Sequence, residues 1–321
     1  MKILVAGAQG FVGRALCPAL VAAGHVVRAG ARRPSAATPG HGEPVRLDLN
    51  DDTTLRPALQ GVDAVIWLVH GLQRASFASW EEAVAARFAA AARDTGLRRI
   101  VYLGGVLPTT LTAAGRVPAA PSEHLRARQR TGERLREAAP SVLELRAGII
   151  VGGGGASFRL LRDLAVRAPV MVRVPWLAAE QQPVALTDVI AALVAVVGRD
   201  ATGVLDVPGP TIVTTEALLR RTAALLGRQV RFVDVRVPAA LVVEAAARLT
   251  RADDNVVRGI LGGVDAVDLV APGEGVFAAV PGLPRTPLDV ALRDALVAEE
   301  RSVGAATAAV EELLGLVWGH R

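Results

Sequence analysis

The sequence of 321 residues contains only one cysteine, one tyrosine and, at Lys2, one lysine. A single cysteine, Cys17, cannot form an internal disulfide, so the fold must rely on its core, as expected in a reducing cytoplasm. Cys17 lies among apolar residues of an expected first helix, which favours a buried structural side chain over a nucleophile. The five histidines have no metal-ligand spacing and no cysteine partners, so we expect no metal site.

Apolar runs long enough to cross a bilayer are also lacking. The longest stretches, Ala147–Ala156 and Val189–Gly198, are about half of the 18 to 20 residues that a span needs. The amino-terminal apolar segment is interrupted by glycines and has no small-residue cleavage site, so export is not expected. Because 51% of the residues are hydrophobic and 21% charged, the composition excludes a disordered chain. The sequence therefore predicts a folded, cytoplasmic protein without a membrane span.

The net charge of +5 does not indicate a nucleic-acid partner. Nearly all basic residues are arginines spread along the expected helices, and aromatic residues make up only 3% of the chain. Nucleic-acid sites typically gather basic residues into a patch, with aromatic side chains interleaved where single strands bind. We expect a small-molecule ligand instead.

The first half of the chain alternates short β-branched runs with longer alanine-rich segments, which is typical of a parallel sheet covered by helices on both faces. The expected strands are Lys2–Ala6, His25–Ala29, Val45–Leu47, Ala64–Val69, Arg99–Leu103 and Val142–Arg146. The expected helices are Phe11–Ala23, Asp52–Leu59, Trp80–Thr95 and Ser122–Ala138. This order predicts an α/β fold with a doubly wound parallel sheet, the Rossmann fold.

After about residue 150 the alternation is less regular. A glycine run at 152–155 and scattered prolines precede helices at Asp188–Val197 and Glu216–Leu226, with strands near Val204–Val207 and Val230–Val235. We interpret residues 1–150 as an NAD(P)-binding domain and 151–321 as a smaller substrate-binding lobe, some of whose segments return to the first domain. Such a lobe would rest on the carboxyl ends of the strands, where open α/β folds bind ligands. An amphipathic helix at Ala305–Val317 would dock on the body or on a partner, and a second copy of the chain is a candidate partner.

A glycine fingerprint follows the first expected strand and opens the first helix. The residues are Gly7-Ala8-Gln9-Gly10-Phe11-Val12-Gly13. In this context Gly7 permits a tight turn, Gly10 lets the backbone approach a pyrophosphate, and Gly13 lets helix and strand pack closely. The helix terminus adds amide donors and positive potential. The segment predicts a dinucleotide site, the alternative being a glycine-rich turn without a ligand.

The end of the second strand decides which dinucleotide is bound. An acidic residue there would bind the adenosine ribose of NAD(H), but the sequence has Arg32 and Arg33. Paired arginines can bind a 2′-phosphate, so NADP(H) is favoured over NAD(H), unless both are merely solvated surface arginines. Asp48, followed by Leu49, ends the third strand and is placed to bond an adenine amino group, with a turn or cap role as the alternative.

Together these features resemble the short-chain dehydrogenase/reductase superfamily. The resemblance spans about the first 240 residues and is strongest to its extended and atypical branch of NmrA-like, complex I accessory subunit-like and epimerase/dehydratase-like NAD(P)H-binding proteins. Besides the fingerprint, it rests on segments 48–49, 63–67, 100–105, 124–128, 144–152, 169–171, Trp176 and 182–183. It implies a nicotinamide cofactor and a soluble oxidoreductase, epimerase or dehydratase.

The resemblance also implies catalytic residues that this chain does not have. Carbonyl-reducing members use a serine after the fifth strand and a tyrosine four residues before a lysine. Here Gly104 or Gly105 stands at the serine position, and His124 and Arg128 stand at the tyrosine and lysine positions. A spacing of four keeps both on one helical face, so His124 could act as general acid and Arg128 could hold the ribose hydroxyls. The alternative is an exposed histidine on an arginine-rich helix.

Other candidates follow from the same resemblance. Val69, His70 and Gly71, at the end of the fourth strand, would border the cofactor ribose, with a turn role as the alternative for His70. Ile149 belongs to the loop whose backbone borders the nicotinamide in the family. Trp176 and Gln182, with Gln181, would line a substrate pocket, although Trp176 could equally be core.

Two functions fit these observations. The first is an NADP(H)-dependent oxidoreductase acting on a small to medium, mostly apolar carbonyl, imine or conjugated substrate, or an epimerase or dehydratase that uses the cofactor transiently. The second is an inactive NAD(P)H-binding redox sensor or assembly protein, which the missing triad and the carboxyl-terminal helix favour. We favour the first because the His124–Arg128 pair and the well-formed second half indicate a retained pocket.

Overall fold

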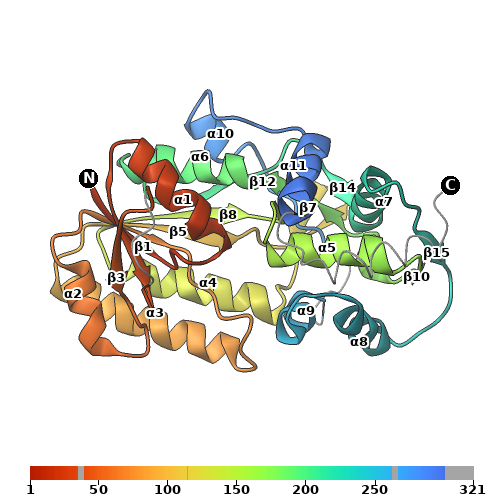
Figure 1. Ribbon diagram of the computed structural model, residues 1–321, viewed down its shortest axis with the longest axis horizontal. Helices are drawn as coiled ribbons and strands as arrows, with labels where there is room; N and C mark the ends of the chain where they lie inside the picture. The colour runs from red at the N-terminus through yellow and green to blue at the C-terminus, as the bar shows by residue number, and fades with distance from the viewer. Residues whose placement is uncertain (35–39, 114, 262–266, 301–321) are drawn as a thin grey trace.

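A seven-stranded parallel sheet forms the centre of the computed structural model, which describes residues 1–34, 40–113, 115–261 and 267–300 (Figure 1). The strand order is β13-β8-β5-β4-β1-β2-β3, and every neighbouring pair is parallel. From β1 the chain first adds β2 and β3 on one side of β1. It then crosses over and adds β4 on the other side, so the strand order reverses between β1 and β4. A crevice forms at such a reversal, outside the carboxyl ends of the strands.

The central strands β1 and β4 are short, mostly apolar runs, as strands buried on both faces require, whereas the edge strands β3 and β13 are more polar and more exposed. The bounds of the sheet strands are β1 Lys2–Ala6, β2 Val26–Ala31, β3 Glu43–Arg46, β4 Ala64–Trp67, β5 Arg99–Gly105, β8 Ser141–Ala147 and β13 Gly203–Asp206. Each expected strand of the first half is present, with ends that differ by one or two residues. The predicted Rossmann fold is confirmed.

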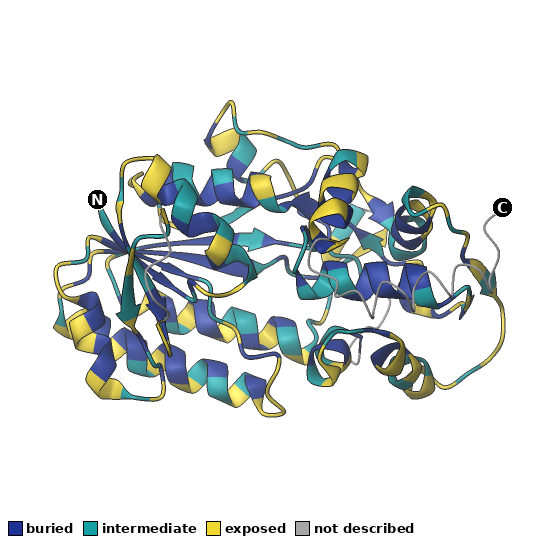
Figure 2. Cartoon of the chain, in the orientation of Figure 1, coloured by how far each residue is buried: buried dark blue, intermediate teal, exposed yellow. Residues whose placement is uncertain are grey.

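Helices cover both faces of the sheet (Figures 1 and 2). One face carries α1 (Phe11–Ala22) and α6 (Leu186–Val197), and the other carries α2 (Leu55–Leu59), α3 (Phe77–Asp94) and α4 (Glu123–Arg136). Each helix turns its buried stripe toward the strands, so two apolar layers enclose the sheet. Cys17 is buried in the layer beneath α1, as predicted.

The rest of the second half gathers beyond the carboxyl ends of the strands around its own apolar core (Figure 1). Its helices are α5 Ala156–Arg167, α7 Thr215–Leu225, α8 Ala239–Leu249, α9 Asp254–Leu261 and α11 Leu288–Glu300. Short strand pairs connect them, namely β10 (Val170–Val172) with β15 (Arg231–Val233), β11 (Glu180–Gln181) with β14 (Val213–Thr214), and β12 (Val184–Ala185) with β9 (Ile150–Val151). The short helix α10 (Val276–Ala279) lies against the sheet layer instead.

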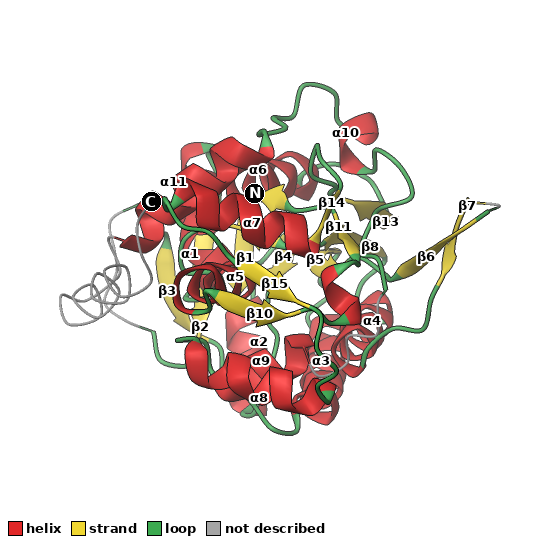
Figure 3. Cartoon of the chain, turned by 90° about the vertical axis from the view of Figure 1, so that its right-hand side faces the viewer, coloured by secondary structure: helices red, strands yellow, loops and turns green. Residues whose placement is uncertain are grey.

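Two elements after residue 150 return to the sheet. Helix α6 packs beside α1, and β13 extends the sheet next to β8. The predicted division at residue 150, with returning segments, stays a prediction. The sequence did not predict the hairpin of β6 (Thr109–Thr112) and β7 (Gly115–Pro118), which projects from the body in Figure 3.

The helix expected at Ala305–Val317 lies outside the described residues. Within the part of the chain that the structure describes, no helix has both the length and the apolar character that crossing a membrane demands.

Candidate functional site

The fingerprint glycines form a turn that tolerates no larger residue. Gly7 has φ +93°, a conformation that favours glycine. A Cβ added at Gly13 would lie 2.3 Å from the Gly7 carbonyl oxygen, and one at Gly10 would lie 3.2 Å from the same atom. Helix α1 therefore packs directly on the turn, as a closely approached pyrophosphate requires.

The amino-terminal end of α1 is available to an anion. Its N-cap, Gly10, offers no side-chain cap, and its first turn holds no acidic residue. The turn is tied to the end of β2, because the amides of Gly7 and Ala8 approach the Gly30 oxygen at 3.3 and 3.2 Å. Ala8 itself is buried. Amide donors and the helix dipole at this end fit a phosphate group.

Arg32 and Arg33 lie exposed directly after β2. Gln9 Nε2 donates to the Arg33 oxygen at 3.0 Å, which holds this loop beside the fingerprint turn. Neither guanidinium has an ion-pair partner among the described residues. Both are therefore available to a phosphate on the adenosine ribose.

Asp48 forms a turn at the end of β3. Its Oδ1 accepts from the Asn50 amide at 3.0 Å, and Leu49 is buried in the core. Trp80 Nε1 in turn donates to Asn50 Oδ1 at 2.9 Å. The turn role proposed as the alternative for Asp48 is thus present, and Leu49 supports the loop from inside.

A cavity of about 200 Å³ lies in the crevice at the carboxyl ends of β1, β4, β5 and β8. Much of its lining comes from the fingerprint, strand ends and His124–Arg128 pair, namely Gly7, Gly10, Phe11, Val12, Gly13, Leu68, His70, Leu103, Gly104, Gly105, His124, Arg128, Ala147 and Gly148. The structure therefore brings six of the predicted cofactor residues, together with His124 and Arg128, into one space.

Two predicted neighbours of His70 do not line this cavity. Val69 packs against the core below the sheet. The Gly71 amide donates to buried Glu81 at 2.5 Å, and a Cβ there would lie 2.7 Å from the Trp80 ring. Both residues shape the loop that carries His70. The prediction that they contact the cofactor is therefore corrected: they hold this loop in place.

Arg128 reaches the cavity across the end of β5. Its Nη2 donates to the Leu103 oxygen, and its guanidinium carbon lies 5.2 Å from the centre of the Tyr102 ring. Tyr102 is buried in β5 and donates to the Arg128 carbonyl at 2.9 Å. Arg128 Nη1 is enclosed without a partner among the described residues. This orphaned donor beside the fingerprint fits a hydroxyl or phosphate of a dinucleotide.

His124 is half-buried, so it is not the exposed histidine of the alternative interpretation. Burial, aided by the Arg128 and His70 charges, lowers the pKa of His124 to about 3. His70 is exposed at the cavity, but lost hydration there and the Arg128 cation lower its pKa to about 4. The imidazole of His124 is therefore neutral at pH 7.

Gly104 shows why a serine is missing after β5. A Cβ at this position would lie 2.7 Å from Glu144 Oε1, a carboxylate buried between Arg136 and Arg146. Arg146 thus pairs with a buried acid. A side chain at position 104 would displace this buried, ion-paired carboxylate, so we expect a polarising hydroxyl to come from another element.

A second cavity of about 210 Å³ lies between the sheet edge and α5, α7 and α9. Its walls are mainly aliphatic. Trp176 lines it, and so does Ile149, which the resemblance had placed beside the nicotinamide and which does not line the first cavity. The two cavities share six residues, Gly105, His124, Ala147, Gly148, Ser157 and Ile260, which we call the junction. Only His124 and Ser157 bring polar side chains to it.

The sequence did not predict Ser157. It is the second residue of α5, half-buried, and its hydroxyl has no partner among the described residues. Its only sequence signal was its position two residues after the glycine run 152–155, at the start of an unpredicted helix.

Gln182 does not line either cavity. Its Nε2 donates to the Gly209 oxygen at 2.9 Å, and its Oε1 accepts from the Ala271 amide at 3.1 Å. The amide is therefore a structural link between loops. The preceding residue, Gln181, lines the apolar cavity instead, and the predicted substrate contact moves to it.

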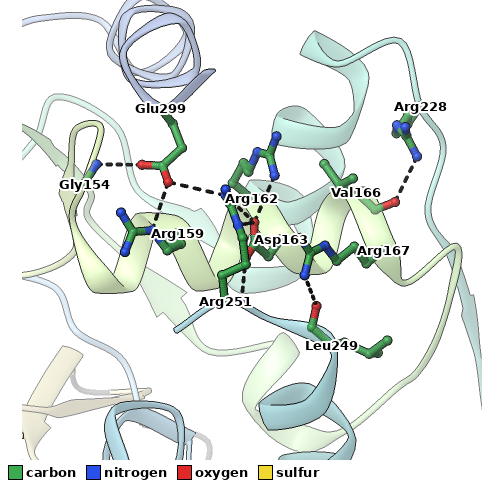
Figure 4. Close-up of polar contacts among 10 residues, drawn as sticks. All are labelled: Gly154, Arg159, Arg162, Asp163, Val166, Arg167, Arg228, Leu249, Arg251 and Glu299. Carbon is green, nitrogen blue, oxygen red and sulfur yellow. Dashed lines mark hydrogen bonds and ion pairs between the residues drawn. The ribbon is translucent and has the colours of Figure 1, made fainter. Parts of the chain in front are cut away.

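A buried charge network holds the loop at 152–155 in place (Figure 4). Glu299 of α11, only 1% exposed, accepts from the Gly154 amide at 2.6 Å and from Arg159 Nε at 2.9 Å. Arg251 joins Glu299 to Asp163 of α5. A Cβ at Gly155 would lie 2.9 Å from the Phe11 ring, so this loop packs on the start of α1. The network thereby supports the fingerprint from the second half of the chain.

Residues 7–144 match the sequence profile of the NAD(P)H-binding family. The match thus covers most of the first half of the chain. The matched segment begins at the first fingerprint glycine and includes the strand ends, His124 and Arg128. The recognition of this family from its motifs is confirmed.

One relative with a known activity matches part of the chain. A 2-alkyl-3-oxoalkanoate reductase of Stenotrophomonas maltophilia is 38% identical over 110 residues, 32% of this chain and 32% of that protein. The match thus spans about a third of that relative's length.

Two solved epimerases have the same fold. UDP-glucose 4-epimerase of Thermus thermophilus, in complex with NAD, has a TM-score of 0.72 at 15% identity, covering 94% of this chain and all of that one. The Thermotoga maritima enzyme, with UDP-glucose, has a TM-score of 0.68 at 14% identity and covers 95% of this chain and all of that one.

No group of three histidine, cysteine, aspartate or glutamate side chains that could hold a metal ion occurs among the described residues.

Proposed function

We propose that the protein is an NADP(H)-dependent oxidoreductase that reduces a carbonyl, imine or conjugated group of a small to medium, mostly apolar substrate. One observation carries this proposal. The cavity built around the glycine fingerprint meets the apolar cavity at the junction, where His124 and Ser157 are the polar side chains. A nicotinamide held in the first cavity would thus face a substrate held in the second.

The residues around the first cavity suit NADP(H). The fingerprint turn and the start of α1 would hold the pyrophosphate, Arg128 the nicotinamide ribose, and Arg32 and Arg33 the 2′-phosphate. NADPH, when bound, supplies a hydride to the carbon of the reacting group. Because the adenosine site carries two arginines and no acid, NAD(H) would bind more weakly.

His124 and Ser157 would act on the substrate oxygen. As a neutral imidazole, His124 can donate a hydrogen bond to the oxygen on which negative charge develops, and the Ser157 hydroxyl can donate a second. The proton that completes an alcohol then reaches the oxygen through His124 or a water molecule. This pair would take the place of the tyrosine and serine that the resemblance led us to expect.

The walls of the second cavity support an apolar substrate. None of its lining side chains is charged, whereas the diphosphate of a nucleotide sugar would call for cationic partners. The partial relative named 2-alkyl-3-oxoalkanoate reductase points to an alkyl-substituted carbonyl compound, but the carboxylate of an oxoalkanoate would find no cationic side chain in this cavity.

Titration calorimetry with NADPH and NADH, followed by absorbance at 340 nm with a panel of ketones, aldehydes and enones, tests the proposal. Tight NADPH binding with oxidation by a panel member would support it. Binding without oxidation would favour the redox-sensor or assembly role, and binding of neither nucleotide would overturn both.

A further inference from the structure

One buried side-chain amide in the apolar cavity has no hydrogen-bond partner among the described residues. Gln181 of β11 is 6% exposed and lines the cavity. Its backbone pairs with Val213 of β14, but its side-chain amide makes no hydrogen bond to any described residue. The amide atoms are not completely enclosed by protein, as expected for a group that faces the cavity. A buried amide without a partner is costly, so a ligand atom is the partner that this position lacks.

Apart from the indole N–H of Trp176, the other polar side-chain groups of this cavity are accounted for. The Ser122 hydroxyl caps α4 by accepting from the Leu125 amide at 3.3 Å, and Thr215 Oγ1 donates to the Ala179 oxygen at 3.3 Å. His124 and Ser157 lie at the junction. Gln181 is not part of the junction, so it marks a second polar point away from the reacting group.

The chemistry of this second point is restricted by its surroundings. An ionised carboxylate or phosphate would find no cationic side chain in the cavity lining, and burying it there would be unfavourable. The glutamine amide offers both a donor and an acceptor, which suits an uncharged hydroxyl, amide or ester. Aliphatic residues such as Leu160, Leu164 and Leu218 fill the rest of the wall.

We infer that Gln181 binds a second, uncharged hydrogen-bonding group of the substrate, separated from the reacting carbonyl by an apolar chain. This inference rests on the proposed function and narrows its substrate class. The expected substrate is an uncharged compound with two functional groups. A plain alkyl ketone would leave Gln181 without a partner, and a free keto acid would bring a carboxylate that has no cationic partner there.

Binding of simple probes tests the inference without turnover. Octanamide, octan-1-ol and octanoate are titrated calorimetrically into the wild type, Gln181→Leu and the control Gln60→Leu, which makes the same change at an exposed position. We expect Gln181→Leu to weaken octanamide and octan-1-ol binding about tenfold or more, and Gln60→Leu to leave it unchanged. Octanoate should bind the wild type at least about tenfold more weakly than octanamide.

Three results would overturn the inference: no binding of octanamide to the wild type, equal octanamide affinity in Gln181→Leu, or octanoate binding as tight as octanamide. Because the substitution removes an unpartnered amide, Gln181→Leu should melt no lower than the wild type, and Gln181→Met repeats the test if the leucine does not fit. NADPH oxidation is measured separately on the same protein. Failure there with intact probe discrimination would overturn the proposed function and leave the Gln181 site standing.

Discussion

At position 13 the backbone has room for a hydrogen atom and nothing larger. A methyl group there would lie 2.3 Å from the Gly7 oxygen and 2.7 Å from the Ala8 Cα, both backbone atoms that cannot move away. We expect Gly13→Ala to displace the fingerprint turn and to weaken NADPH binding at least about 100-fold in calorimetry. Gly273→Ala is the control, since no atom lies within 4 Å of its Cβ. Unchanged NADPH affinity in Gly13→Ala would remove the fingerprint from the cofactor site.

Arg32 and Arg33 distinguish the two dinucleotides. Loss of two charge-assisted contacts should weaken NADPH binding by about 10- to 100-fold in the double variant Arg32→Ala/Arg33→Ala, while NADH affinity changes little. Arg98→Ala removes an exposed arginine before β5, at the other end of the sheet strands, and should alter neither affinity. Equal weakening of both nucleotides would contradict the 2′-phosphate assignment.

The depressed pKa of His124 has a consequence for the pH profile. Because burial and Arg128 lower the pKa to about 3, the imidazole stays neutral and its charge does not change between pH 5.5 and 8. We expect kcat/KM to show no step near 6.5, and His124→Gln to lower kcat about 100-fold with little change in NADPH affinity. A step near pH 6.5 that disappears in His124→Gln would show an ionising general acid instead.

Neighbouring residues show where sequence reasoning about the site succeeds and where it stops. The fingerprint could be predicted because its glycines serve the backbone itself, so their spacing alone carries the signal. Gln181 and Gln182 are adjacent in an extended segment and point to opposite sides, so one lines the cavity while the other links two loops. Which of the two faces a ligand depends on how β11 packs, and no local pattern contains that information.

Helix α5 is the element that connects the second half to the cofactor site. Glu299→Gln would remove the carboxylate shared by the Gly154 amide, Arg159 and Arg251. Since this leaves buried cationic groups with a weaker acceptor, we expect the free energy of unfolding to fall by about 2 kcal/mol and NADPH affinity to fall as the 152–155 loop loosens. Denaturant unfolding measures the first effect and calorimetry the second.

The exposed pair of Glu244 and Arg248 on α8 provides the control for that change. Its atoms lie 3.4 Å apart and Arg248 is largely exposed, so Arg248→Ala should cost less than about 0.5 kcal/mol. Similar losses in Glu299→Gln and Arg248→Ala would mean that the network around Glu299 does not hold the loop.

Among the elements, those buried on both faces could be predicted from the sequence, because they read as continuous apolar runs. β4 is a fully apolar run, and β5 carries a charge only at its first residue, Arg99. Such runs after glycine turns are recognised from sequence alone. Helix α5 was not predicted because it follows a glycine run and carries Arg162 and Asp163 in its buried stripe, which only the network with Arg251 makes tolerable. The β6–β7 hairpin contains few apolar residues and pairs mainly with itself.

For the whole molecule, the account depends on how the two halves meet. The sheet supplies the crevice, and the second half supplies the apolar walls, Ser157 and Gln181. Their meeting at the junction agrees with a lobe resting on the carboxyl ends of the strands, as the sequence order predicts. It requires that hydride leaves a nucleotide in one cavity for a carbonyl carbon in the other.

Transfer of deuterium from NADPH labelled at C4 of the nicotinamide tests that requirement most directly. The protein is incubated with each of the two C4-deuterated stereoisomers and medium-chain ketones, with and without a terminal hydroxyl, and the alcohols are analysed by mass spectrometry. The account predicts one deuterium on the carbinol carbon from one stereoisomer only, and much less in His124→Gln. Bound NADPH that passes no deuterium to any ketone would contradict a reductase and leave a nucleotide-binding protein without this chemistry.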